Sequence, residues 1–219
     1  MIEIDRRHLL QFAVAGVAGA LLSRAPRVLA ADTVRVTRKE PVIQRFEFDP
    51  KRPLAGMPKL TPPEAGVCNT DFSLDCGVAY SIDVVSPTAV KVTVDELDLG
   101  VLLTLKLYTQ KGSPAKLHAH EEAHAAIAQY YYKNAVRYAQ EVGKAHIGKS
   151  FDGMGRDKKS AQQDGYAKIV QSLLDAYNPH TRFRALAANN RFDEITRHGT
   201  LPIAEADAIA MAVASDPEV

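Results

Sequence analysis

The segment His120–His124 constrains the fold of this chain more than any other part of the sequence. It reads H-E-E-A-H and matches the H-E-x-x-H pattern, in which two histidines four residues apart contribute to one metal site. Residues four apart stack on one face of an α-helix, so His120 and His124 can offer two imidazoles to one ion when the segment is helical. We therefore expect a helix here, with one side facing a metal.

Glu121 adds a chemical function to the pair of histidines. A zinc ion with three protein ligands and one open position lowers the pKa of its water to about 7. A neighbouring carboxylate can accept a proton from that water and deliver it to the leaving group. The motif predicts one Zn²⁺ on His120 and His124, with Glu121 as the catalytic base. The alternative is a polar helix face on which these side chains happen to share a turn.

Residues 1–31 have the pattern of an export signal. Asp5–Leu9 contains an Arg pair, Phe12–Leu22 is an apolar run, and Val28–Ala30 supplies small residues before a cleavage point after Ala30 or Ala31. The Arg pair resembles the twin-arginine signal, although Asp and Leu stand where Ser or Thr and Phe are usual. The apolar run has about half the roughly 20 residues that span a bilayer, which makes an uncleaved anchor the second interpretation. We expect a periplasmic or secreted protein.

The remaining residues, 32–219, have the size and composition of one domain. Export would remove four of the 27 basic and two of the 26 acidic residues, which changes the net charge from +1 to about −1. Such a balance lacks the basic excess of nucleic-acid-binding proteins. We expect no nucleic acid as a partner and no stable membrane span after cleavage.

Two cysteines, Cys68 and Cys76, lie close together in the segment CNTDFSLDC. In an oxidising compartment such a pair is expected to form a disulfide. The alternative is a pair of thiolate ligands to zinc.

Residues 32–110 have the alternation and β-branched content of strands. The segments Val78–Val85, Ala89–Val94 and Leu99–Tyr108 are the clearest strands, and the short connections favour hairpin pairing. The acidic segment Asp95–Asp98 is predicted to be a turn. This half of the chain is therefore expected to be β-rich.

Residues 111–219 have helical patterns. A first helix is expected from Ser113–Pro114 through the histidine motif to about Val142 or beyond, because apolar residues recur every four positions. Further helices are expected at 158–176 and 203–214. The Gly-rich segment Gly148–Arg156 is predicted to be a loop. The fold class that follows is α+β, a β-rich half followed by a helical half.

The motif supplies two ligands, and zinc needs a third. The extended motif, with a further histidine six residues after the second, is absent because Tyr130 stands there. The third ligand must come from a later segment, and Phe192–Gly199, which reads F-D-E-I-T-R-H-G, is the richest in suitable side chains.

An H-E-x-x-H helix followed at this distance by an aromatic-Asp-x-x-Thr-x-His-Gly segment resembles the bacterial secreted zinc-dependent proteases grouped as domain of unknown function 922. The resemblance covers about residues 78–199 and implies a zincin-like fold, a metallopeptidase activity and a peptide or protein substrate. It implies that His198 is the third metal ligand, that Asp193 orients a ligand imidazole and that Thr196 makes local hydrogen bonds. Phe192 departs from the pattern, since Tyr is common there, and no Trp or Gln follows Gly199 in the family's style.

Other residues in the helical half admit a role as well. Glu194 is an alternative carboxylate ligand to His198, and His118 is expected at the rim of the site. His146 and His180 are expected at the surface. A tyrosine could stabilise an oxyanion, but the sequence does not choose among them.

The predicted function is an exported zinc-dependent metallopeptidase. Two alternatives stay open: an exported protein that binds zinc or a partner without catalysis, and a zinc amidase acting on cell-wall peptides.

Overall fold

The computed structural model describes residues 33–60 and 64–216, which belong to one compact unit, Asp32–Val219. The predicted export signal and its cleavage point lie outside the described residues. Helices and a mixed sheet occur together in the described part, which confirms the α+β class. Among these residues, no helix has the length and apolarity needed to cross a membrane.

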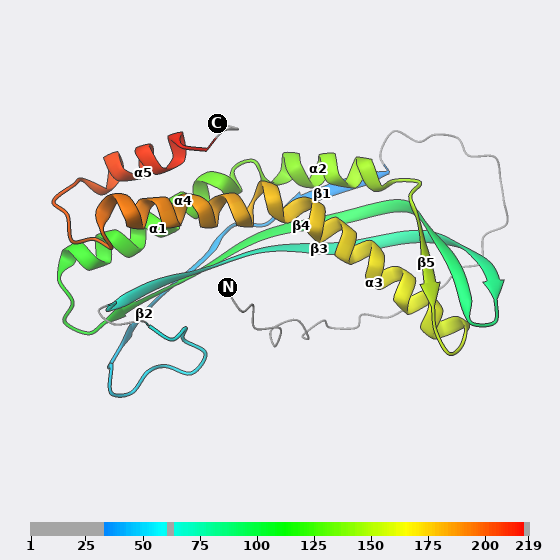
Figure 1. Ribbon diagram of the computed structural model, residues 1–219, viewed down its shortest axis with the longest axis horizontal. Helices are drawn as coiled ribbons and strands as arrows, with labels where there is room; N and C mark the ends of the chain where they lie inside the picture. The colour runs from blue at the N-terminus through cyan, green and yellow to red at the C-terminus, as the bar shows by residue number, and fades with distance from the viewer. Residues whose placement is uncertain (1–32, 61–63, 217–219) are drawn as a thin grey trace. The chain divides into compact units, whose positions relative to one another are not determined.

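A long hairpin organises the sheet (Figure 1). Strand β3 (Gly66–Ser86) pairs antiparallel with β4 (Ala89–Gln110) along almost its whole length. Three short strands pair with successive parts of β4: β5 (Ser150–Met154) is antiparallel, whereas β1 (Val34–Arg38) and β2 (Val42–Phe48) are parallel. The hairpin confirms the expected strand pairing, and the parallel strands were not foreseen.

The segment Asp95–Asp98 is not the predicted turn, because β4 continues through it. The pairing shifts there: Ala79 pairs with Glu96, whereas the next residue, Tyr80, pairs with Val94. Asp95 is thus an extra residue in β4, a β-bulge. The bulge keeps the buried residues on one face although their positions change from even to odd numbers, as the burial of Val90, Val92 and Val94 and then of Leu97, Leu99, Val101, Leu103, Leu105 and Leu107 shows.

Three helices cover one face of the sheet. These are α1 (Ala115–Tyr132), α2 (Ala135–His146) and α3 (Lys158–Tyr177). Helices α4 (Arg182–Thr196), which follows the short 3-10 helix Asn178–His180, and α5 (Glu205–Ala214) pack on α1 and on each other (Figure 1). The helix that carries the histidine motif therefore lies between the sheet and α4.

The helical half differs from expectation in two places. The helix of the motif does not continue to Val142, because Lys133 and Asn134 bond to carbonyls three residues back and Asn134 leaves the helical conformation, which separates α1 from α2. The predicted loop Gly148–Arg156 contains β5, which β4 recruits as a neighbour through bonds that include Gly148 N–H to Val94 O. Pairing with an existing strand overrides the weak strand preference of that sequence.

The predicted disulfide between Cys68 and Cys76 is absent, and both cysteines are free. Both lie on β3, eight residues apart. An extended strand rises about 3.3 Å per residue, so their Cα atoms are about 26 Å apart. A disulfide needs Cα atoms within about 7 Å, which also rules out joint coordination of one ion. The sequence interval was short, but the strand keeps the thiols apart.

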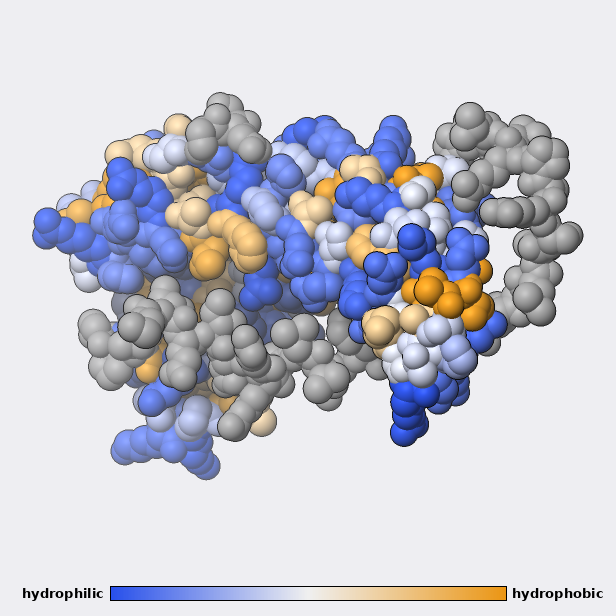
Figure 2. Space-filling model, turned by 45° about the vertical axis from the view of Figure 1, so that its right-hand side comes forward, coloured by the Kyte–Doolittle hydropathy of each residue, from blue (hydrophilic) through white to orange (hydrophobic). Residues whose placement is uncertain are grey.

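The far end of the hairpin is apolar on its surface. Val84, Val85 and Met154 are among the exposed large hydrophobic residues, and the strand register brings them together around Ala89. Figure 2 shows apolar side chains gathered at this end of the sheet. This patch lies at the opposite end of β3 from Gly66, and so at a distance from the histidine motif.

Candidate metal centre

The two motif histidines are held between helices α1 and α4. His120 and Glu121 are almost fully buried, with 4% and 3% of their surface exposed. Apolar residues of α1, including Ile127 and Ala128, belong to the core under the sheet. The rest of the helix thereby fixes the direction in which the motif points, toward the last turns of α4.

Asp193 of α4 completes a cluster of three ligand atoms. His120 Nε2 and His124 Nε2 lie 3.2 Å apart, and each lies 3.1 Å from Asp193 Oδ1. Ligands about 2.0 to 2.1 Å from a tetrahedral zinc ion are separated from one another by about 3.3 Å. The three atoms therefore have the spacing of three corners of a tetrahedral site, and the group could hold a metal ion.

The charges of the cluster are strongly coupled. Burial opposes ionisation of Asp193, but His120 and His124 outweigh it and hold the pKa of that carboxyl far below its usual range. Burial also opposes the charged form of His124, while Asp193 and Asn189 outweigh it and raise the pKa of that imidazole. Asp193 Oδ1 is buried, and its contacts with the two imidazoles at 3.1 Å lack good hydrogen-bond geometry. A cation at the centre of the three atoms would give each of them a well-placed partner.

Phe192 forms an apolar wall behind the histidines. Its fully buried ring stacks on His120 with centroids 5.0 Å apart and meets His124 edge to face at 5.1 Å. The two imidazoles meet each other edge to face at 4.7 Å. The rotation of both rings is thus restricted by packing, which favours a preformed ligand geometry.

The end of α4 is shaped by Thr196 and Gly199. The Thr196 hydroxyl donates to Phe192 O and accepts from Gly199 N–H. Arg197, His198 and Gly199 all have positive φ, between 49° and 75°. This left-handed run brings Gly199 so close to His120 that a Cβ atom at position 199 would lie 3.2 Å from the imidazole. Its φ of +75° and this close approach both favour glycine at position 199.

Glu121 lies beside the cluster and faces the start of β3. Burial raises the pKa of Glu121 to about 7, with smaller opposing and supporting contributions from His124 and Asp193. Its Oε2 atom is buried and makes no hydrogen bond. A carboxyl group with such a pKa can gain and lose a proton near neutral pH.

His198 lies at the rim of the cluster. Its Nδ1 atom is 3.8 Å from Asp193 Oδ1, and 69% of its side chain is exposed. It does not belong to the group of ligand atoms that lie within 4.8 Å of one another, which consists of His120, His124 and Asp193. Glu194 is also exposed and pairs with Arg191 at 3.0 Å. The geometry thus favours Asp193, rather than either of these two, for the third ligand position.

His146 is not the surface residue that was expected. It is 2% exposed, and its Nδ1 donates to Val142 O while its Nε2 accepts from the Ser172 hydroxyl. Both bonds suit a neutral imidazole between α2 and α3. A lone histidine gives no sequence signal for such a role.

Two tyrosine hydroxyls have partners elsewhere in the fold. Tyr131 donates to Asp216, and Tyr166 donates to the main-chain carbonyl of Cys76. The sequence left the choice of an oxyanion-stabilising tyrosine open, and these bonds give both groups a structural role.

Asn189 was missed by the sequence interpretation. Its Oδ1 lies 2.8 Å from His124 Nδ1, on the opposite side of the ring from the cluster. Asn189 and Asp193 are four residues apart and share one face of α4. That spacing, equal to the spacing of the two histidines on α1, was a signal available in the sequence.

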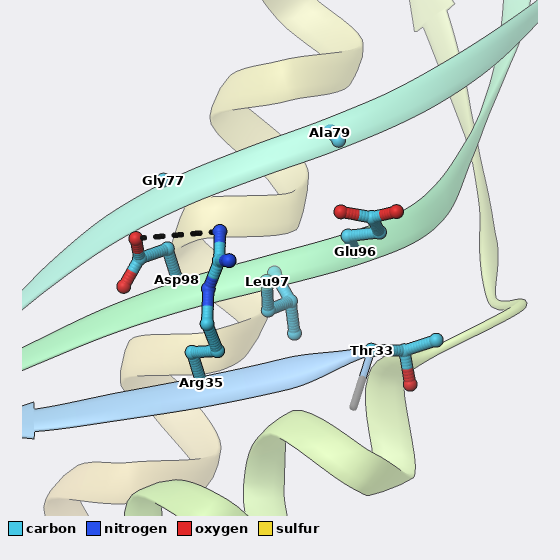
Figure 3. A pocket seen from close by; sticks show the side chains of 7 residues that line it. All are labelled: Thr33, Arg35, Gly77, Ala79, Glu96, Leu97 and Asp98. Carbon is cyan, nitrogen blue, oxygen red and sulfur yellow. Dashed lines mark ion pairs between the residues drawn. The ribbon is translucent and has the colours of Figure 1, made fainter. Parts of the chain in front are cut away.

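Two hollows lie outside the cluster. One, of about 90 Å³, is on the helix-free face of the sheet next to the bulge; Figure 3 shows its lining, with the Arg35–Asp98 ion pair on β1 and β4. The other, of about 510 Å³, lies between α4 and α5 and is lined by residues that include Phe183, Arg184 and Ala212. Neither is lined by the motif residues.

Comparison of the chain with protein families, with curated proteins and with solved structures finds no match.

Proposed function

We propose that this protein is an exported zinc-dependent hydrolase of peptide bonds. One observation carries the proposal: His120 Nε2, His124 Nε2 and Asp193 Oδ1 lie 3.1 to 3.2 Å from one another beside the buried carboxyl group of Glu121. The resemblance of the two motifs to secreted zinc-dependent proteases points to the same reaction and to a zincin-like site.

Zinc is the ion that this donor set fits best. Two imidazoles and one carboxylate are a common ligand set of catalytic zinc, which keeps a fourth position open for water or substrate. The distances within the cluster match three corners of a tetrahedron around such an ion. We expect one zinc per chain.

The residues around the cluster would have distinct roles. Zinc, when bound, would acidify a water molecule and polarise the scissile carbonyl group. Glu121 would accept the proton of the attacking water and pass it to the leaving amine, for which its raised pKa is suited. Phe192 restricts the ligand rings. The exposed His198 ring, at the rim of the cluster, would contact a bound substrate.

The metal assignment is tested by elemental mass spectrometry of the purified protein and its variants. We expect about one zinc per wild-type chain, loss of zinc in His124→Ala and Asp193→Ala, and retention in His198→Ala. Glu194→Ala is the matched control, because Glu194 is an exposed carboxylate next to Asp193 on the same helix. Loss of zinc in His198→Ala with retention in Asp193→Ala would restore His198 as the third ligand.

The reaction is tested with a panel of peptides and peptidoglycan fragments. The Glu121→Gln variant should keep its zinc and lose at least about 100-fold in peptide cleavage, because general-base catalysis contributes that much or more. An active Glu121→Gln variant would refute the mechanism. Cleavage of cell-wall fragments alone would indicate an amidase, and zinc binding without any turnover would indicate a non-catalytic zinc protein.

A further inference from the structure

His124 has a hydrogen-bond partner on each side of its ring. On the cluster side, Nε2 lies 3.1 Å from Asp193 Oδ1 and 3.2 Å from His120 Nε2. On the other side, Nδ1 lies 2.8 Å from Asn189 Oδ1. A neutral imidazole carries one proton, and the partners on the two sides compete for it.

The two sides have opposite consequences for metal binding. A proton on Nε2 would donate to the Asp193 carboxylate and block the nitrogen that faces the cluster. A proton on Nδ1 donates to the amide oxygen of Asn189 and leaves the lone pair of Nε2 free for a metal. In a metal-free protein the carboxylate favours the first arrangement, so the second needs a dedicated acceptor.

We propose that Asn189 is a positioning residue that keeps the proton of His124 on Nδ1 and so presents Nε2 as a metal ligand. The inference rests on the proposed function, since it concerns the same ion. The inference adds Asn189 to the proposed metal site as a residue that contacts neither the ion nor the substrate. Asn189 lies one turn before Asp193 on the same face of α4. One face of this helix therefore supplies both a metal ligand, Asp193, and the group that orients a second ligand, His124.

The acceptor at this position is a neutral amide. Asp193 and Glu121 already bring two acidic groups to the cluster, and Asn189 accepts the hydrogen bond without adding a third charge. His120 lacks the same support, because its Nδ1 atom is buried without a hydrogen-bond partner. Of the two motif histidines, only His124 therefore has a side-chain acceptor that can fix the position of its ring proton.

Two measurements test the inference. The first is the tautomer of His124 in the metal-free protein, read from the ¹⁵N chemical shifts of its ring at a pH high enough to keep the ring neutral, since its neighbours raise the pKa of His124. We expect the Nδ1–H form in the wild type and a shift toward the Nε2–H form in Asn189→Ala. The second is zinc affinity, measured by competition with a chelator. We expect Asn189→Ala to bind zinc roughly 10- to 100-fold more weakly, the usual effect of removing a group that orients a metal ligand.

The chain offers a matched control and a conservative variant. Asn190→Ala removes the same side chain at the neighbouring, exposed position and should change neither readout. Asn189→Asp keeps an acceptor at the same place, so it should keep the Nδ1–H form and bind zinc at least as tightly as the wild type. If Asn189→Ala does not fold, the Asp variant still tests the inference, since a shift to Nε2–H or weaker zinc binding in it would overturn the role.

The outcomes separate this inference from the proposed function. A wild type that shows the Nδ1–H form but binds no zinc would refute the function and leave the hydrogen bond in place. A wild type that binds zinc, together with an Asn189→Ala variant of unchanged tautomer and unchanged affinity, would refute the role of Asn189 alone.

Discussion

Gly66, the first residue of β3, lies directly against the carboxyl group of Glu121. A Cβ atom built on Gly66 would be 2.6 Å from Glu121 Oε1 and 3.0 Å from two further atoms of that side chain. The sheet and the helix thus approach each other very closely where the proposed general base sits. The absence of a side chain at position 66 is what allows the carboxyl group to occupy its place.

Replacement of Gly66 by alanine should therefore displace Glu121. The new methyl group would collide with a side chain that is 3% exposed and cannot move freely. A shift of about 1 Å in a catalytic group can lower a rate by roughly 100-fold, so we expect a fall in kcat of about 10- to 100-fold. The zinc content should not change, because Gly66 does not approach the histidines. Steady-state kinetics and elemental analysis measure the two effects.

Gly77→Ala is the control for this experiment. Gly77 lies on the same strand but on its helix-free face, where a Cβ atom would be 3.3 Å from the Asp98 carbonyl oxygen. This variant should keep full activity. Equal losses in Gly66→Ala and Gly77→Ala would show that the effect comes from the strand and not from Glu121.

The helical part of the site was predictable because its signals are local. The spacing of His120 and His124 requires a helix, and the apolar stripe that follows selects the buried face. Asp193 and Thr196 were singled out from the motif that contains them, although Asp193 was assigned a supporting role. The choice between Asp193 and His198 depends on the left-handed turn after α4, which three consecutive positive φ values define and which no local pattern in the sequence reveals.

The sheet was harder to predict because its pairing is not local. The sequence Asp95–Asp98 is acidic and suggests a turn, yet β3 pairs with both of its sides and converts Asp95 into a bulge. The strand Ser150–Met154 has little intrinsic strand preference and exists because β4 offers it an edge. Cys68 and Cys76 appear close in sequence, and only the length of β3 separates them.

The cysteines should behave as two free, slowly reacting thiols. Burial raises the pKa of both Cys68 and Cys76 to about 12, so little thiolate exists at pH 8 in the folded protein. We expect slow alkylation in native conditions and two adducts per chain after unfolding without a reductant, as intact-mass spectrometry would show. Dithiothreitol should leave the Tm unchanged. A chain that needs reduction before it accepts two adducts would contradict the strand geometry.

Gly199→Ala should weaken both the fold and the metal site. The φ of +75° disfavours alanine, and the methyl group would lie 3.2 Å from the His120 ring. Alanine at a positive φ costs about 1 kcal/mol or more of stability. We expect that loss in urea unfolding, together with weaker zinc binding in chelator competition, because His120 must shift.

Gly148→Ala separates the two effects. Gly148 has a similar φ of +79°, but a Cβ atom there meets nothing within 4 Å. It should lose a similar amount of stability and bind zinc like the wild type. Unchanged zinc affinity in Gly199→Ala would show that the close approach to His120 has no effect on the site.

His146 should make the stability of the protein depend on pH. Burial lowers the pKa of His146, the nearby Lys149 lowers it further, and the bond to Val142 O opposes this. The unfolded chain takes up a proton at this residue near pH 6.5, whereas the folded chain does so only at lower pH. The stability contributed by the neutral ring is therefore complete above about pH 6.5 and decreases as the pH falls below it.

We expect the wild type to lose more free energy of unfolding between pH 7.5 and pH 5.5 than the His146→Gln variant, which cannot titrate at this position. The difference in slope cannot exceed about 1.4 kcal/mol per pH unit. Urea unfolding of both proteins at several pH values, with a chelator present to remove any contribution from metal, measures it. Parallel pH dependences would mean that burial between α2 and α3 does not hold the pKa of His146 below its value in the unfolded chain.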